Sequence, residues 1–150
     1  MPNWRDELIE AVKTKSEREA EEAAKQRQRV LEALSSAEGA VTLASDALRF
    51  ACDRISEKGQ AAALQEEQVE AAADEGGGSR TKLVRLTLGS LALAVELDRS
   101  TAIVKVSYLE GKPREFDFAR DRHIAAADVE EYVGRRAVEL VRSAQKAAAW

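Results

Sequence analysis

Apolar residues between Val30 and Ile55 recur at alternating intervals of four and three positions. The positions are Val30, Leu34, Ala37, Val41, Ala44, Leu48, Ala51 and Ile55. This spacing is typical of a coiled-coil seam, in which one face of a helix packs against a second helix. The seam therefore predicts a helix–helix contact, made either with a second copy of the chain or by the chain folding back as a hairpin. We expect self-association, most simply as a homodimer.

Residues 1–75 as a whole have the composition of a helical arm. No proline follows Pro2, and the strong helix formers Ala, Glu, Gln, Lys and Arg dominate. Asn3 is a suitable N-cap residue. The heptad phase crosses Gly39 without a slip, which favours one continuous helix there, whereas Gly59 could either end a helix or lie within it. A short apolar stripe near the start of the arm comprises Trp4, Leu8, Ile9 and Val12.

The second half of the chain alternates apolar and polar residues, which is typical of half-buried strands. The dipeptide Gly89-Ser90 separates two such runs, and glycine in the first central position suits a type II′ hairpin turn. This turn would pair Leu88 with Leu91 and, further along, Val84 with Val95. All of the apolar side chains would then share one face of the sheet.

A second two-residue turn, at Arg99-Ser100, would continue this face into a third strand, with Val95 opposite Val104 and Leu97 opposite Ala102. A three-residue loop around Glu110-Gly111 would add a fourth strand and turn its two phenylalanines toward the same face. The predicted strands of this antiparallel meander are 80–88, 91–98, 101–108 and 113–119. The opposite face is mixed, and its apolar members are Leu83, Ala92, Ala94 and Ile103.

A helix is predicted from about Ala126 to Ala149, because apolar residues return there at helical spacing. Its stripe consists of Val129, Val133, Ala137, Leu140, Val141 and Ala144. A sheet with one apolar face needs a cover, which this helix supplies. The predicted fold class is therefore α+β, with a long N-terminal coiled-coil-like arm, a four-stranded antiparallel meander and a C-terminal helix that covers it.

The glycine-rich segment Gly76-Gly77-Gly78-Ser79 divides two regions of opposite charge. Residues 1–75 hold 10 Lys/Arg and 17 Asp/Glu, whereas residues 76–150 hold 13 Lys/Arg and 10 Asp/Glu. Three consecutive glycines have no side chains to pack and favour a flexible joint. We therefore predict a helical oligomerisation arm over 1–75, a joint over 76–79 and a ββββα domain over 80–150.

Residues with catalytic or metal-binding chemistry are few. His123 follows Asp121 and could act as a base or a ligand, but one histidine without clustered carboxylates favours an ordinary loop residue. Cys52 suits a small buried side chain better than a reactive thiol. The chain has no phosphate loop, dinucleotide fingerprint or nucleophile elbow. We therefore expect no enzymatic activity, no cofactor and no metal.

The cellular location is predicted from the same composition. The sequence has no run of about 18 apolar residues, which a membrane-spanning helix needs. Its first residues lack the layout of a signal peptide. A lone cysteine cannot form an intrachain disulfide, which suits a reducing compartment. We expect a cytoplasmic protein that does not bind membranes.

The C-terminal half carries arginines that could contact nucleic acid or another acidic partner, namely Arg114, Arg120, Arg122, Arg135, Arg136 and Arg142. Interleaved acidic residues, such as Glu115 and Glu139, count against this interpretation, as does the net charge of −4. The basic half could instead attract the acidic arm. In layout, the order of long helix, meander and closing helix resembles the small nucleoid-associated proteins of the YbaB type, which are dimers with three strands between two helices. The resemblance implies nucleic-acid binding and carries no site residues, and this chain has an extra strand and a longer arm.

These observations predict a non-catalytic, homo-oligomeric scaffold or adaptor protein. It would self-associate through its N-terminal helix and present its small α+β domain to a protein partner. The alternative is an architectural nucleic-acid-binding protein that uses the basic residues of the C-terminal half.

Overall fold

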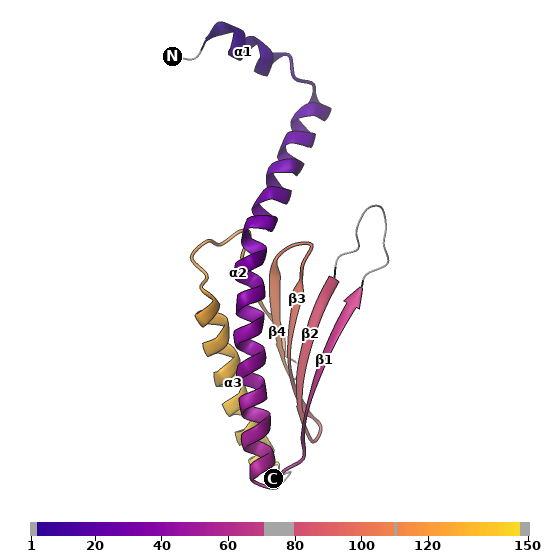
Figure 1. The fold of residues 1–150 in the computed structure, drawn as a ribbon, viewed down its shortest axis with the longest axis vertical. Coiled ribbons are helices and arrows are strands. Elements are labelled where there is room, and N and C mark those ends of the chain that lie inside the picture. The colour runs from indigo at the N-terminus through magenta and orange to yellow at the C-terminus, as the bar shows by residue number, and fades with distance from the viewer. Residues whose placement is uncertain (1–2, 71–79, 110, 148–150) are drawn as a thin grey trace.

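The computed structural model describes residues 3–70, 80–109 and 111–147. Two helices, α2 and α3, cover one face of a five-stranded antiparallel sheet whose strands follow one another in chain order (Figure 1). The elements are α1 (Trp4–Ala11), α2 (Lys15–Glu57), β1 (Ala62–Glu70), β2 (Arg80–Leu88), β3 (Leu91–Asp98), β4 (Ile103–Tyr108), β5 (Arg114–Asp117) and α3 (Ala126–Lys146). The predicted α+β class is confirmed, with five strands in place of four.

The core lies between the helices and the apolar face of the sheet. The sheet contributes the buried residues Val84, Leu86, Leu88, Leu93, Val95, Leu97, Val104, Val106 and Phe116. The predicted stripe of α3 faces them, with Val129, Val133, Ala137, Leu140 and Ala144 buried. At the edge formed by β5, the ring of Phe116 meets that of Tyr132 edge to face, with 5.7 Å between the ring centroids. The prediction that α3 covers the sheet is thus confirmed.

The hairpin between β2 and β3 has the predicted register, with Leu88 opposite Leu91 and Val84 opposite Val95. Gly89 has a φ of 62°, which suits the first central position of a type II′ turn. The turn chemistry and the alternation of apolar residues therefore agree on one pairing.

The register between β3 and β4 differs from the prediction by two residues. Val95 lies opposite Val106 rather than Val104, so the two-residue turn at Arg99-Ser100 was wrong. The Oδ1 atom of Asp98 accepts hydrogen bonds from the backbone N–H and the hydroxyl of Ser100, at 2.9 and 2.6 Å, and organises a longer loop. Because side chains alternate along a strand, a shift of two leaves every side chain on its predicted face.

The last strand is shorter than predicted but presents the expected residues. The predicted three-residue loop before it was wrong, because β4 ends at Tyr108 and β5 begins only at Arg114. Phe116 lies opposite Val104 in the ladder between β4 and β5. Both Phe116 and Phe118 are buried, as predicted. Residue Glu110 in the connecting loop lies outside the described residues.

Two side-chain caps divide the arm near its beginning. The Oδ1 atom of Asn3 accepts a hydrogen bond from the backbone N–H of Arg5 at 3.2 Å, which confirms Asn3 as the N-cap of α1. The hydroxyl oxygen of Thr14 accepts from the backbone N–H of Glu17 at 3.2 Å and starts α2. The arm therefore consists of two helices, and Thr14 is a cap that the sequence analysis missed.

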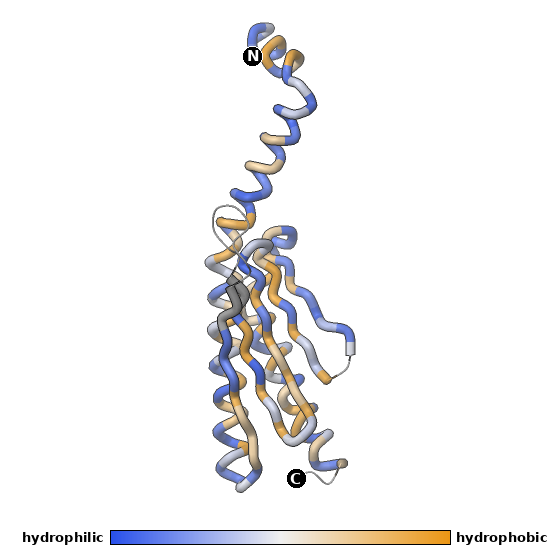
Figure 2. The backbone as a smooth tube through the Cα atoms, turned by 90° about the vertical axis from the view of Figure 1, so that its right-hand side faces the viewer, coloured by the Kyte–Doolittle hydropathy of each residue, from blue (hydrophilic) through white to orange (hydrophobic). Residues whose placement is uncertain are grey.

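Helix α2 runs unbroken through Gly39, as the heptad phase predicts, and ends at Glu57. Gly59 then has a φ of 79°, in the left-handed region that favours glycine at the end of a helix. Gly59 could have ended the helix or lain within it, and in the structure the helix ends before this residue. The first part of α2 extends well beyond the sheet and is largely hydrophilic, and it holds α1 at its far end (Figure 2).

Residues 62–70, predicted as helix, form the edge strand β1. This strand pairs with β2 along its whole length, with Leu64 opposite Leu86. A contact from α2 supports it, because the Arg49 guanidinium lies 2.9 Å from a carboxylate oxygen of Glu66. Helix-favouring composition concealed the strand, since few of its residues are apolar.

The predicted division between an arm over 1–75 and a domain over 80–150 does not follow the observed core. Strands β1 and β2 are neighbours in one sheet, and the C-terminal part of α2 packs in the same core. The predicted joint at 76–79 lies outside the described residues.

Candidate interaction surfaces

The predicted self-association seam packs within its own chain. Its members Ala37, Val41, Ala44, Leu48 and Ile55 are buried in the core beneath the sheet and beside α3. The remaining members, Val30, Leu34 and Ala51, are half-buried against the same core. The sequence identified a real packing face, but the partners of that face are the sheet and α3 of the same molecule. These residues therefore leave little surface for a second chain.

Helix α1 and its C-cap residue Val12 present four exposed large apolar side chains. Trp4, Leu8, Ile9 and Val12 are 65%, 53%, 61% and 66% exposed. No residue of α1 is buried. An exposed apolar cluster of this kind is typical of a contact surface.

An ion-pair cluster links α1 to α2. The Lys13 ammonium lies 2.7 Å from a carboxylate oxygen of Glu10 and 2.6 Å from one of Glu21. Hydrogen bonding to Lys13 holds the pKa of Glu10 below its ordinary value, and the bonds to Glu10 and Glu21 raise the pKa of Lys13. These contacts tie the two helices together where the chain turns.

A second apolar surface is a groove of about 670 Å³ on the outer side of the helix pair α2–α3. Its exposed apolar residues are Phe50 and Val138, with 63% and 50% of their surfaces accessible. Gly134 has open space where a Cβ atom would lie, which keeps the groove wide. The guanidinium of Arg54 lies over the ring of Phe50, 5.1 Å from its centroid. The groove has the shape and apolar lining that an amphipathic helix prefers.

The uncovered face of the sheet is mixed, as the sequence predicts. Leu83, Ala92, Ala94 and Ile103 are half-buried among polar neighbours. The pair Lys105 and Glu115, with 3.7 Å between their charged atoms, crosses β4 and β5 on this face. The apolar positions are therefore scattered between charges, and the face is less suited to docking than the groove.

Two of the six predicted contact arginines, Arg114 and Arg136, lie over the ring of Tyr132. The guanidinium of Arg114 lies 5.7 Å and that of Arg136 lies 5.1 Å from the centroid of this ring. Arg135 and Arg136 also pair with Glu131 and Glu139, each at 2.9 Å. Much of their charge is therefore balanced within α3.

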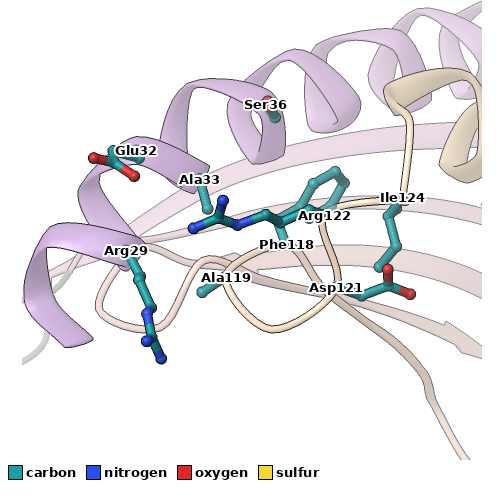
Figure 3. Close-up of a pocket in the computed structure, with 9 residues that line it drawn as sticks. All are labelled: Arg29, Glu32, Ala33, Ser36, Phe118, Ala119, Asp121, Arg122 and Ile124. Carbon is teal, nitrogen blue, oxygen red and sulfur yellow. The ribbon is translucent and has the colours of Figure 1, made fainter. Parts of the chain in front are cut away.

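Arg142 is exposed on α3, and Arg120 and Arg122 lie elsewhere, in the loop between β5 and α3. This loop approaches α2 at the point where the helix leaves the domain (Figure 3). There the two loop arginines meet Arg29 of α2 and line a hollow of about 500 Å³. Arg29 was not among the contact arginines predicted from the sequence, because its position next to the loop depends on how α2 packs.

His123 and Cys52 have ordinary surroundings. His123 is exposed, and Asp121 accepts a hydrogen bond from its backbone N–H at 2.9 Å rather than from the ring. Cys52 is free and half-buried beside the core. Within the described residues no group of three or more His, Cys, Asp or Glu side chains could hold a metal ion. Among the described helices none is both long and apolar enough to cross a membrane.

Comparison with protein-family models, with curated proteins and with solved structures gave no match.

Proposed function

We propose that the protein is a non-catalytic adaptor that self-associates through its N-terminal helical arm and presents its α+β domain to a protein partner. The observation that carries this proposal is the apolar stripe of α1 and its C-cap residue Val12, whose four large side chains are each more than half exposed. Exposed apolar surface of this extent favours association, because covering it removes it from water.

The geometry of α2 supports association between chains rather than within one. The apolar groove begins near Leu43, and α2 runs unbroken from Lys15 to that residue. At 1.5 Å per residue this separates α1 from the groove by about 40 Å. One chain therefore cannot cover its own α1 with its own groove. We assign α1 to self-association and the groove to the protein partner, which would supply an amphipathic helix.

The proposal is tested by measuring molar mass with light scattering at micromolar concentration. The wild type is expected at about twice the 16.4 kDa of one chain. The double variant Leu8→Asp, Ile9→Asp is expected at the mass of one chain, because it places charges in the apolar contact.

Val138→Asp is the matched control, since Val138 is exposed and apolar but lies in the groove. It should keep the wild-type mass. A monomeric wild type contradicts the proposal, and dissociation by Val138→Asp would assign self-association to the groove instead of α1.

The architectural nucleic-acid-binding alternative has weaker support. Of its six arginines, only Arg120 and Arg122 line the hollow beside α2, and Arg135 and Arg136 already have carboxylate partners. A salt-dependent mobility shift that is lost in the triple variant Arg135→Glu, Arg136→Glu, Arg142→Glu would favour it over the adaptor proposal.

A further inference from the structure

Three arginines from two distant segments line one hollow where α2 leaves the domain. Arg29 comes from α2, and Arg120 and Arg122 come from the loop between β5 and α3. Arg29 and Arg122 also line an adjoining hollow of about 250 Å³. Figure 3 shows the side chain of Arg122 extending from the loop toward α2, with Ala33 facing it and Phe118 beside it. The fold therefore brings together cationic groups that are about 90 residues apart in the sequence.

Arginines outnumber carboxylates in the lining of the larger hollow. Among the described residues, none of the three arginines forms an ion pair, whereas Arg49, Arg54, Arg135 and Arg136 each do. The larger hollow has one carboxylate in its lining, that of Asp117, which accepts a hydrogen bond from the backbone N–H of Arg120 at 3.1 Å. Three guanidinium groups against one carboxylate give the lining of the larger hollow an excess of positive charge, whereas the adjoining hollow also has the carboxylates of Glu32 and Asp121 in its lining. An excess of positive charge around a hollow favours a bound anion.

The loop that carries two of the arginines is held in place by the core and by side-chain caps. Phe118 is buried, and its backbone N–H donates to the carbonyl oxygen of Ala102 at 3.2 Å. The carboxylates of Asp117 and Asp121 accept backbone N–H groups of the loop and fix its turns. A loop that is ordered before binding loses little conformational entropy when a ligand arrives.

We propose that this hollow binds the phosphate group of a small phosphomonoester, with the guanidinium groups of Arg29, Arg120 and Arg122 as donors. The negative charge of a phosphate group complements the excess of arginine in the larger hollow, and the planar guanidinium donates to phosphate oxygens in a bidentate way. The volume of about 500 Å³ is that of a small-molecule site.

The proposal is tested by isothermal titration calorimetry with inorganic phosphate and with phenyl phosphate at constant ionic strength. Saturable binding to the wild type is expected. Arg29→Gln and Arg122→Gln should each weaken binding at least about tenfold, since each removes a charge-assisted donor. Arg142→Gln is the matched control, because Arg142 is an exposed arginine that lines neither hollow, and it should leave the affinity unchanged. Circular dichroism spectra that match the wild type verify that the variants fold.

Three outcomes overturn the proposal. One is the absence of saturable binding of either phosphate compound to the wild type. Another is an equal loss of affinity in Arg142→Gln, which would mean that the phosphate responds to overall charge. The third is binding of a 20-base-pair DNA duplex that requires Arg29 and Arg122 while the small phosphates do not bind, which would assign the cluster to a nucleic-acid surface. Repeating the titration with Leu8→Asp, Ile9→Asp separates phosphate binding from self-association.

Discussion

The two parts of α2 differ sharply in burial although they belong to one continuous helix. From Ala37 onward the helix buries one face against the sheet and α3, whereas residues 15–29 are exposed throughout (Figure 1). Both parts are rich in alanine and charged residues, so helix-forming composition does not distinguish them. What distinguishes them is the apolar period, which is present from Val30 onward and absent before it. A helix of about 15 residues is marginal alone in water, so the projecting part depends on its continuity with the packed part.

The largest expected change in the free energy of unfolding comes from the buried face of α2, and the exposed face of the helix provides the comparison. Leu48 is fully buried and Leu31 is exposed. Leu48→Ala should lower the free energy of unfolding by about 2–5 kcal/mol, because it leaves a cavity in the core. Leu31→Ala should change it by less than about 0.5 kcal/mol. Urea denaturation followed by circular dichroism measures both changes. If Leu48→Ala instead dissociated a dimer without loss of stability, the seam would face a second chain, and the intrachain packing would be wrong.

A smaller effect is expected at Ser45, the one buried polar residue of the packed part of α2. Its hydroxyl oxygen has no hydrogen-bond partner among the described residues. Ser45→Ala should raise the free energy of unfolding by about 1 kcal/mol, because the unpaired hydroxyl is costly to bury. Ser35→Ala on the exposed face is the control for helix propensity alone. Equal gains in the two variants would mean that burial at Ser45 carries no penalty.

The sequence predicted best those elements in which the turn residues and the pattern of apolar positions favour the same structure. In the β2–β3 hairpin, Gly89 favours the turn and the alternation of apolar residues favours the same register. At the β3–β4 connection the apolar pattern fixes only the face, because a shift of two residues leaves it unchanged. The longer loop there is organised by the hydrogen bonds that the Asp98 carboxylate accepts from Ser100, and a count of alternating positions does not reveal them.

The candidate sites were less predictable because they depend on packing between distant segments. Arg120 and Arg122 were recognised as basic residues, but Arg29 joins them only because α2 docks against the loop. Strand β1 was missed for a similar reason, since its pairing with β2 is what makes it a strand. The apolar seam was identified correctly as a packing face, but a heptad pattern does not specify whether a helix or a sheet covers it.

A smaller effect is expected from two glycines, one within α2 and one just beyond its end. Gly39 lies inside α2, and a Cβ atom there would meet nothing within 4 Å. Gly39→Ala should therefore raise the free energy of unfolding by about 0.5–1 kcal/mol through helix propensity. Gly59 has a φ of 79° beyond the end of α2, so Gly59→Ala should lower it by about 1 kcal/mol. Thermal or urea unfolding should give opposite signs, and the same sign for both would mean that α2 does not end at this glycine.

The smallest expected effect concerns the junction at which α1 joins the exposed part of α2. The hydrogen bond to Lys13 lowers the pKa of Glu10. Its stabilisation of the α1–α2 junction is therefore present when the pH is above 4.5, the ordinary pKa of glutamate, and is lost as the pH falls through the lowered pKa. The pKa of Lys13 is raised, so the stabilisation that this residue gives the junction is present when the pH is below 10.5, the ordinary pKa of lysine. It is lost as the pH rises through the raised pKa. The junction should therefore be most ordered between these values. A carbon-13 titration of the Glu10 carboxyl should have its midpoint below 4.5 in the wild type and near 4.5 in Lys13→Gln. An unchanged midpoint in Lys13→Gln would mean that the ion pair does not hold α1 against α2, and that the exposed arm is ordered by its caps at Asn3 and Thr14 alone.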